Sequence, residues 1–205
     1  MDVLVTHTRD TLRWALPDAA FRLLPFSLAV ALTWLLWRPR WLGLAPGAIG
    51  PQLTLGLAGF LVLFLGSISI RLTLARRRGR VVTPATAASA AGEGAYYLLN
   101  APIEEAFFRG LVQGGLTQVG GPWLGLAVGV SAYVLYHRLG RWPWAEVAAT
   151  ALAGLPLALA FWLLPGAPSL LGVSIAHAGA TCGFLGPGPY LLRRLGLLGS
   201  PVSTG

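Results

Sequence analysis

The chain has 205 residues, of which 55% are apolar, and its mean hydropathy is +0.67. This composition excludes an ordinary soluble domain and predicts an integral membrane protein, and the length allows one compact helical bundle because each spanning helix uses about 20 residues. The net charge of +8 comes from arginine alone, and the arginines lie at the ends of apolar runs without the aromatic interleaving of a strand-binding groove. We therefore expect contacts with membrane lipid and none with nucleic acid.

The apolar runs follow one another with short polar or Gly/Pro-rich breaks. The segment before the first run mixes acidic and basic residues, which does not fit a cleaved signal peptide, so we interpret that run as a retained helix. One span follows the small, polar segment 83–94, carries two glutamates and ends before Gly120-Gly-Pro122. We predict an all-α fold, a polytopic membrane helical bundle of about six transmembrane helices. The other spans are expected at residues 23–37, 53–70, 123–136, 147–164 and 170–192.

The distribution of arginines predicts a multi-pass orientation in the cell membrane. The strongest basic segment, residues 71–80, is expected on the cytoplasmic side by the positive-inside rule. Both termini would then be cytoplasmic, although Arg38 and Arg40 oppose this scheme. Two later pairs fall on the cytoplasmic side in a six-span count: Arg138/Arg141 and Arg193/Arg194.

Three ionisable residues lie within six positions of the third span: Glu104, Glu105 and Arg109. An ionised side chain at mid-bilayer costs roughly 2.5–3.5 kcal/mol on insertion scales, so we expect a partnered, functional interior site. Glu105 and Arg109 have the i,i+4 order that favours an ion pair. Glu104 points about 100° away around the helix and has no partner within this motif, which makes it the freer carboxylate.

Two later spans each carry a histidine and a hydroxyl-bearing residue four positions apart, a spacing that puts both side chains on one helix face. Tyr133 precedes His137, and Thr181 follows His177. Together with Glu104, these groups could converge from three helices on one polar pocket. An acid, two imidazoles and a hydroxyl are sufficient for water activation and oxyanion stabilisation.

Structural roles are the alternative for these residues taken singly. Glu105 and Arg109 could staple helices together, and His137 could be an interfacial group at a helix end. Thr181 could bond back to its own helix, and Tyr133 could serve packing alone. We favour function for Glu104, and for His137 because it accompanies Glu104.

The order of these motifs resembles that of the CAAX protease and bacteriocin-processing family, glutamate-type intramembrane endopeptidases related to the type II CAAX prenyl protease. The family's Glu-Glu-x-x-x-Arg, Phe-x-x-x-His and His-x-x-x-Asn motifs are similar to Glu104-Glu-Ala-Phe-Phe-Arg109, Tyr133-Val-Leu-Tyr-His137 and His177-Ala-Gly-Ala-Thr181. The resemblance implies an intramembrane protease core at residues 94–190. Residues 1–93 would hold an N-terminal tail, two transmembrane helices and a basic cytoplasmic loop, and residues 191–205 a short C-terminal tail.

The resemblance also implies a role for each residue. Glu104 and His137 would hold and deprotonate the attacking water. His177 and Thr181 would stabilise the oxyanion, although Thr181 stands where the family has Asn, and a hydroxyl is a shorter donor than a carboxamide. The site residues implied are catalytic Glu104, His137, His177 and Thr181, with Glu105 and Arg109 holding Glu104 in place.

The predicted function is hydrolysis of a peptide bond in a membrane-anchored or secreted-peptide substrate by activated water, with no cofactor. A zinc site formed by Glu104, His137 and His177 is an alternative, although no His-Glu-x-x-His helix supports it. Alternatives of other classes are a non-enzymatic bacteriocin-immunity or membrane scaffold protein and a small proton-coupled transporter. The chain lacks the internal repeat that many transporters show.

Overall fold

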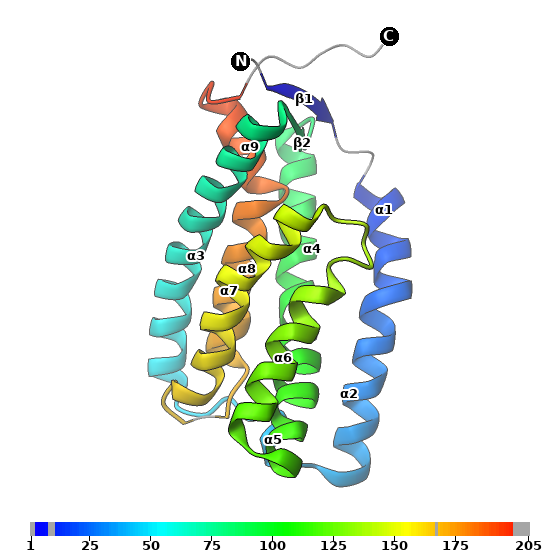
Figure 1. The fold of residues 1–205 in the computed structure, drawn as a ribbon, viewed down its shortest axis with the longest axis vertical. Coiled ribbons are helices and arrows are strands. Elements are labelled where there is room, and N and C mark those ends of the chain that lie inside the picture. The colour runs from blue at the N-terminus through cyan, green and yellow to red at the C-terminus, as the bar shows by residue number, and fades with distance from the viewer. Residues whose placement is uncertain (1–2, 8–10, 167, 199–205) are drawn as a thin grey trace.

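The computed structural model describes residues 3–7, 11–166 and 168–198, and most of these residues are helical. The N-terminal helix continues from α1 through a π-helical segment, η1, into α2. It lies along one edge of the bundle, with α3 along the opposite edge (Figure 1). The first elements are α1 (Thr11–Asp18), η1 (Ala19–Leu23), α2 (Leu24–Trp37), the 3-10 turn η2 (Arg40–Leu42) and α3 (Ile49–Arg78).

The two glutamates lie on a second continuous helix, which we call the glutamate helix. It begins after Thr86, whose hydroxyl accepts a hydrogen bond from the backbone N–H of Ser89 and so caps the first turn. It ends at Gly121, where a φ of +84° suits glycine and Pro122 starts the next helix. Its parts are α4 (Ala87–Glu105), the π-helical η3 (Ala106–Gly114) and α5 (Gly115–Gly120).

Four further helices complete the bundle. They are α6 (Pro122–Tyr136), α7 (Trp144–Leu163), α8 (Leu171–Phe184) and α9 (Pro187–Arg194). The predicted fourth and fifth spans agree with α6 and α7 to within a few residues. The predicted sixth span was too long, because the helix breaks at Gly186, which has a φ of +50°, and α9 is separate.

Two boundaries near the N-terminus also differ from the prediction. The first helix begins at Thr11 rather than near residue 23, so Arg22 lies inside it. The basic run Arg76–Arg78 closes α3 instead of forming a loop, and Gly79 ends that helix in the left-handed conformation. Charged residues in the last turns interrupt the apolar pattern, so hydropathy alone indicates a loop there.

Both π-helical segments follow a proline within the helix: Pro17 precedes η1 and Pro102 precedes η3. Proline lacks a backbone N–H and its ring clashes with the carbonyl four residues earlier, so the regular hydrogen-bond ladder is interrupted there. π-Helical turns are frequent at functional sites. η1 contains Arg22 and η3 contains Arg109, and both arginines contact the paired glutamates.

α3 and α8 pack closely because glycines on α8 face the backbone of α3. A Cβ on Gly179 would lie 2.3 Å from the carbonyl oxygen of Phe60, and a Cβ on Gly183 would lie 2.3 Å from that of Phe64. Neither distance is sterically possible, so only glycine allows this approach. Small residues commonly allow such close packing of membrane helices.

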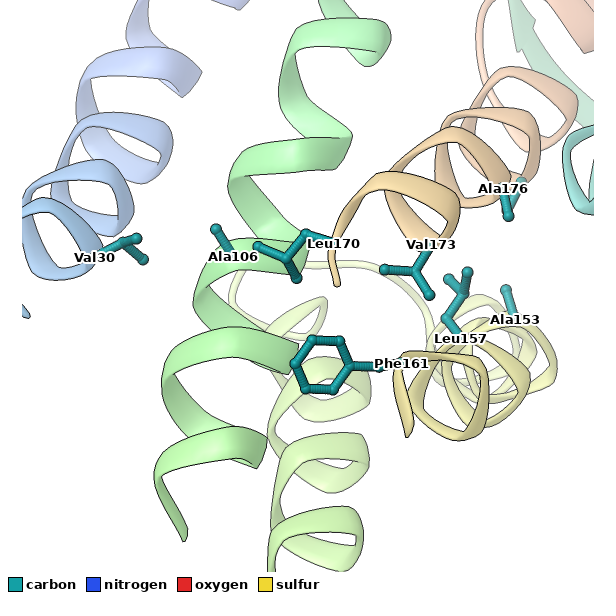
Figure 2. Packing of buried hydrophobic residues seen from close by; sticks show 9 residues of the cluster. Val30, Ala106, Ala153, Leu157, Phe161, Leu170, Val173 and Ala176 are labelled. Atoms are coloured by element: carbon teal, nitrogen blue, oxygen red, sulfur yellow. The ribbon is translucent and has the colours of Figure 1, made fainter. Parts of the chain in front are cut away.

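The main apolar core lies between the glutamate helix, α7 and α8. Figure 2 shows Leu157 and Phe161 on α7 and Val173 on α8 within this core. Several core positions adjoin polar residues of the site: Ala106 follows Glu105, and Ala176 precedes His177. The same packing that buries the core therefore brings these polar side chains into the interior.

One small sheet was not anticipated. β1 (Leu4–His7) pairs in parallel with β2 (Arg80–Thr83), with Val5 opposite Val81. These two valines are buried in a second apolar cluster with Leu192 of α9. The sheet, the C-terminal end of α3 and α9 lie at one end of the bundle, opposite α5 (Figure 1). The basic segments that end α3 and α9 therefore lie at the same end, and the side of the membrane that this end faces stays a prediction.

Three helices among the described residues are long and apolar enough to cross a membrane: Arg13–Trp37, Ile49–Arg78 and Trp144–Leu163. α6 and α8 are shorter apolar helices. The predicted all-α membrane fold is confirmed apart from the small sheet, and the count of six spans stays a prediction. The C-terminal tail predicted at residues 191–205 includes residues 199–205, which lie outside the described residues.

Candidate active site

The structure brings the three predicted motifs together from three helices. Glu104 and Glu105 end α4, His137 caps the C-terminus of α6, and His177 lies in the middle of α8. His177 contacts both glutamates, through Nδ1 to Glu105 Oε1 at 2.8 Å and through Nε2 to Glu104 Oε2 at 3.5 Å. The predicted convergence of an acid pair and imidazole groups is therefore found.

Glu105, Arg109 and His177 form what we call the inner cluster. Arg109 Nε lies 3.3 Å from Glu105 Oε2, which confirms the predicted i,i+4 ion pair. Arg109 Nη2 also donates to the carbonyl oxygen of Gly154 on α7 at 3.1 Å. Both side chains of the ion pair are completely buried. A buried pair of this kind is a fixed structural element, because either charge left alone would be strongly destabilising.

Tyr133 connects the inner cluster to α6. Its hydroxyl lies 3.2 Å from His177 Nε2, and the guanidinium of Arg109 lies over its ring, 4.7 Å from the centroid. Because His177 Nδ1 faces a carboxylate, we assign a proton to Nδ1, so in the neutral ring Nε2 accepts from Tyr133. Tyr133 therefore does more than pack, since its buried hydroxyl has a polar partner.

Asp18, Arg22 and Glu104 form what we call the outer cluster. Arg22 Nη1 contacts Glu104 Oε1, and Arg22 Nε donates to Asp18 Oδ1 at 3.0 Å. The hydroxyl of Tyr136 donates to Glu104 Oε1 at 3.4 Å. Within its own helix Glu104 has no cationic partner, as predicted, but the N-terminal helix supplies one. Glu104 is therefore paired, but by a residue outside its own motif.

The sequence contains one indication of the outer cluster. Asp18 and Arg22 are four residues apart and so form an ion pair on one helix face. In the sequence, Arg22 directly precedes the apolar run predicted as the first span, a position typical of a boundary residue and not of a site residue. Nothing in the local pattern showed that this helix would lie against Glu104.

A cavity of about 900 Å³ lies beside these clusters. Glu104, His137 and Thr181 line it, together with Arg22 and Tyr136. His177, Glu105 and Arg109 are not among its lining residues, so the inner cluster lies behind the cavity wall. Glu104, His137 and Thr181 can therefore contact a ligand in this cavity directly. The fourth predicted catalytic residue, His177, is connected to the cavity only through its contacts with Glu104 and Tyr133.

The orientation of His137 is set by its own helix. Its Nδ1 lies 2.8 Å from the carbonyl oxygen of Tyr133, and because a carbonyl can only accept, Nδ1 carries the proton. The lone pair is then on Nε2. The ring also packs against Trp142, with centroids 5.0 Å apart. An imidazole held in this tautomer can accept a proton or a hydrogen bond from water at Nε2.

The arrangement provides groups that can polarise a water molecule. A carboxylate, an imidazole with an available lone pair and the hydroxyl of Thr181 share one cavity wall. In the part of the chain that the structure describes, no three His, Cys, Asp or Glu side chains are placed to hold a metal ion. The chemistry that these side chains can perform themselves is general acid–base catalysis.

The comparison with protein families agrees with this geometry. Residues 91–182 match the family model described as type II CAAX prenyl endopeptidase Rce1-like. The matched segment contains every predicted site residue, from Glu104 to Thr181. Comparisons with curated proteins and with solved structures gave no match. The predicted resemblance to the CAAX protease family is therefore confirmed over residues 91–182, and the family model that they match is one of proteases.

Proposed function

We propose that this protein is a glutamate-type intramembrane endopeptidase. It hydrolyses a peptide bond of a membrane-anchored or secreted-peptide substrate with water activated by Glu104 and His137. The observation that carries the proposal is the placement of these two side chains in one cavity wall, backed by the buried inner cluster. Fixed polar groups around a carboxylate are expected where charge develops during a reaction.

Glu104 is the general base in this proposal. Arg22 and Tyr136 contact Oε1, and Oε2, which lies 3.5 Å from His177 Nε2, is the oxygen that takes the proton. His137 Nε2 accepts a hydrogen bond from the same water and fixes its position. The water oxygen attacks the carbonyl carbon, its proton moves to Glu104, and Glu104 then transfers that proton to the leaving nitrogen as the C–N bond breaks.

Thr181 and His177 stabilise the oxyanion in this proposal. The Thr181 hydroxyl lines the cavity and can donate directly. His177 acts indirectly from behind the wall: its Nε2 lies 3.2 Å from the hydroxyl of Tyr133, which lines the cavity, and when the ring is protonated Nε2 donates to that hydroxyl, so that Tyr133 can donate its own proton to the oxyanion. A donor directed at a developing oxyanion contributes about 10²–10³ in rate in well-studied enzymes.

The proposal includes the surroundings of the reaction. The protein would span the cell membrane several times with both termini in the cytoplasm, in contact with membrane lipid, and would need no cofactor. Its substrate would be a membrane-associated peptide or protein. These parts follow from the arginine distribution and the family resemblance.

The test is proteolysis in detergent or liposomes against a library of membrane-anchored peptides. We expect Glu104→Ala and His137→Ala to lose cleavage by about 10²-fold or more and to keep the melting temperature of the wild type. Arg138→Ala is the matched control, because Arg138 is exposed next to His137 and is not a cavity residue. Full activity of Glu104→Ala would refute the proposed base.

Two further arms separate the alternatives. Cleavage that persists with chelator present supports water activation by the side chains, whereas loss of cleavage that zinc restores supports the metal alternative. A scaffold or immunity protein predicts a different pattern: Glu104→Ala would lower the melting temperature and the abundance in the membrane, and no library peptide would be cut.

A further inference from the structure

The wall of the cavity contains a second group of charges, which we call the arginine end. Arg71 Nη1 donates to Glu146 Oε1 at 3.1 Å, and Arg78 Nη1 donates to the same oxygen at 2.5 Å. Arg71 and Glu146 both line the cavity that contains Glu104. The arginine end consists of these three residues and comes from α3 and α7.

The arginine end has more positive than negative charge. Two guanidinium groups share one carboxylate, so one positive charge is not compensated within the group. Arg71 is only 9% exposed, and its Nε has no hydrogen-bond partner among the described residues. A guanidinium has five N–H donors, and a buried charge with unused donors is expected to have a functional partner.

Aromatic rings connect the arginine end with the catalytic wall. The ring of Trp142 lies 5.0 Å from that of His137 and 5.8 Å from that of Phe184. The guanidinium of Arg71 lies 5.1 Å from the centroid of Phe184. All four residues line the cavity. An extended peptide advances about 3.3–3.6 Å per residue, so about five residues at most separate the site of attack from Arg71.

The outer cluster, which lines the same cavity, has the opposite sign. In the outer cluster two carboxylates, Asp18 and Glu104, share the one guanidinium of Arg22. A peptide that carries an anionic group would therefore be repelled at the outer cluster and attracted at the arginine end. Charges separated in this way orient a ligand within a low-dielectric cavity.

We propose that Arg71 is an anion subsite that binds a carboxylate of the substrate, either the terminal carboxylate or an acidic side chain, within about five residues of the hydrolysed bond. The placement of that bond rests on the proposed function, whereas carboxylate binding by Arg71 does not. Phe184 positions the guanidinium, and Glu146 holds one of its edges. The unused donors of Arg71 bind the carboxylate oxygens.

Binding can be measured without hydrolysis, in detergent, on the Glu104→Gln variant by calorimetry. The probes are acetyl-trileucine with a free carboxylate, its carboxamide, and the carboxamide with the central leucine replaced by aspartate. We expect the acid to bind roughly 10- to 100-fold more tightly than the carboxamide. Arg71→Gln should abolish this difference, and Arg76→Gln, which removes an exposed arginine from the same helix, should keep it.

Each result decides one point. If the aspartate carboxamide binds as tightly as the acid, the carboxylate comes from a side chain, and if only the acid binds tightly, it comes from the terminus. If the Glu104→Gln variant with Arg71 intact binds the acid and the carboxamide with equal affinity, the proposal that Arg71 binds a carboxylate is overturned. If Arg71→Gln does not fold, Glu146→Gln replaces it: this change frees Arg71 and should tighten binding of the acid, and unchanged or weaker binding would contradict the proposal.

Failure of the subsite and failure of the proposed function are distinguishable. Arg71-dependent binding of the acid with no peptide cleaved would support the subsite and count against the protease. Cleavage that requires Glu104 with equal affinity for acid and carboxamide would support the protease and overturn the subsite.

Discussion

The inner and outer clusters each contain an ion pair between an arginine and one of two adjacent glutamates, but their surroundings differ. In the inner cluster Glu105 and Arg109 are completely buried and belong to one helix. In the outer cluster Glu104 meets Arg22 from another helix, and the Arg22 side chain is 21% exposed and faces the cavity. We therefore expect the pair of Glu105 and Arg109 to stabilise the fold, and the pair of Glu104 and Arg22 to contact the ligand.

The largest expected effect is on stability, in the inner cluster. Arg109→Ala leaves Glu105 in the interior without its arginine and held by His177 alone, and breaking a buried ion pair in this way costs about 3–5 kcal/mol of folding free energy. We expect a large fall in melting temperature and in the amount of protein recovered from membranes. Arg138→Ala is the control for the loss of an exposed arginine. If Arg109→Ala melts at the same temperature as the wild type, the inner cluster does not stabilise the fold.

The next effect is on activity, in the outer cluster. Arg22→Ala removes the group that orients Glu104, and displacement of a catalytic group by about 1 Å can cost about 10²-fold in rate, so we expect kcat/KM to fall by about 10- to 100-fold. Glu104 is only 2% exposed, but it lines the cavity and keeps the Tyr136 contact, so melting should fall less than in Arg109→Ala. Arg22→Lys should recover only part of the activity, because an ammonium group lacks the planar fork of guanidinium. Equal losses of stability in Arg22→Ala and Arg109→Ala would end the distinction between the clusters.

Two tyrosines on α6 allow a finer comparison. Tyr133→Phe removes the hydroxyl bonded to buried His177 and should cost about 1 kcal/mol of stability. Tyr136→Phe removes a longer contact, 3.4 Å, to Glu104 at the cavity, and should change stability by less and kcat/KM by a few fold. Thermal unfolding and proteolysis of both variants would be measured together. The reverse ranking of the two stabilities would contradict the burial argument.

The smallest effect is expected at Asp18. Its side chain is 32% exposed, and its bond to Arg22 is an i,i+4 contact of the kind that stabilises helices by about 0.2–0.5 kcal/mol. Asp18→Asn should therefore leave melting almost unchanged and reduce kcat/KM less than Arg22→Ala does. A double-mutant cycle of Asp18→Asn with Arg22→Ala measures the interaction energy between these two side chains. A loss of activity as large as that of Arg22→Ala would show that Asp18 has a direct role.

The two clusters also show which parts of the site could be predicted from the sequence. The pair of Glu105 and Arg109 follows from helical spacing, and the grouping of Glu104 with His137 and His177 follows from three polar motifs on apolar spans. Arg22 could not be placed, because its contact with Glu104 joins residues 82 positions apart and depends on how two helices pack. The separation of His177 from the cavity likewise depends on packing and not on residue type.

The helices were predicted better in their middle than at their ends. α6 begins at Pro122 directly after Gly121, and α7 begins after Pro143 and ends just before Pro165. The backbone preferences of proline and glycine are local, and the limits of these helices were predicted closely. α3 and the N-terminal helix extend beyond their apolar segments into charged turns, where hydropathy no longer reports the helix. The parallel pairing of β1 and β2 joins segments about 75 residues apart and has no local signature.

The π-helical geometry of η3 makes the glutamate helix sensitive to the number of its residues. Each residue of an α-helix turns the chain by about 100°, so the loss of one residue from η3 would rotate everything beyond it relative to Glu104. Gln113 would then leave the carbonyl of Ala158, which it bonds at 2.9 Å, and Gly114 would leave the backbone of Trp41, against which no larger residue fits. Single-residue insertions and deletions in this segment should therefore be far more harmful than most substitutions there.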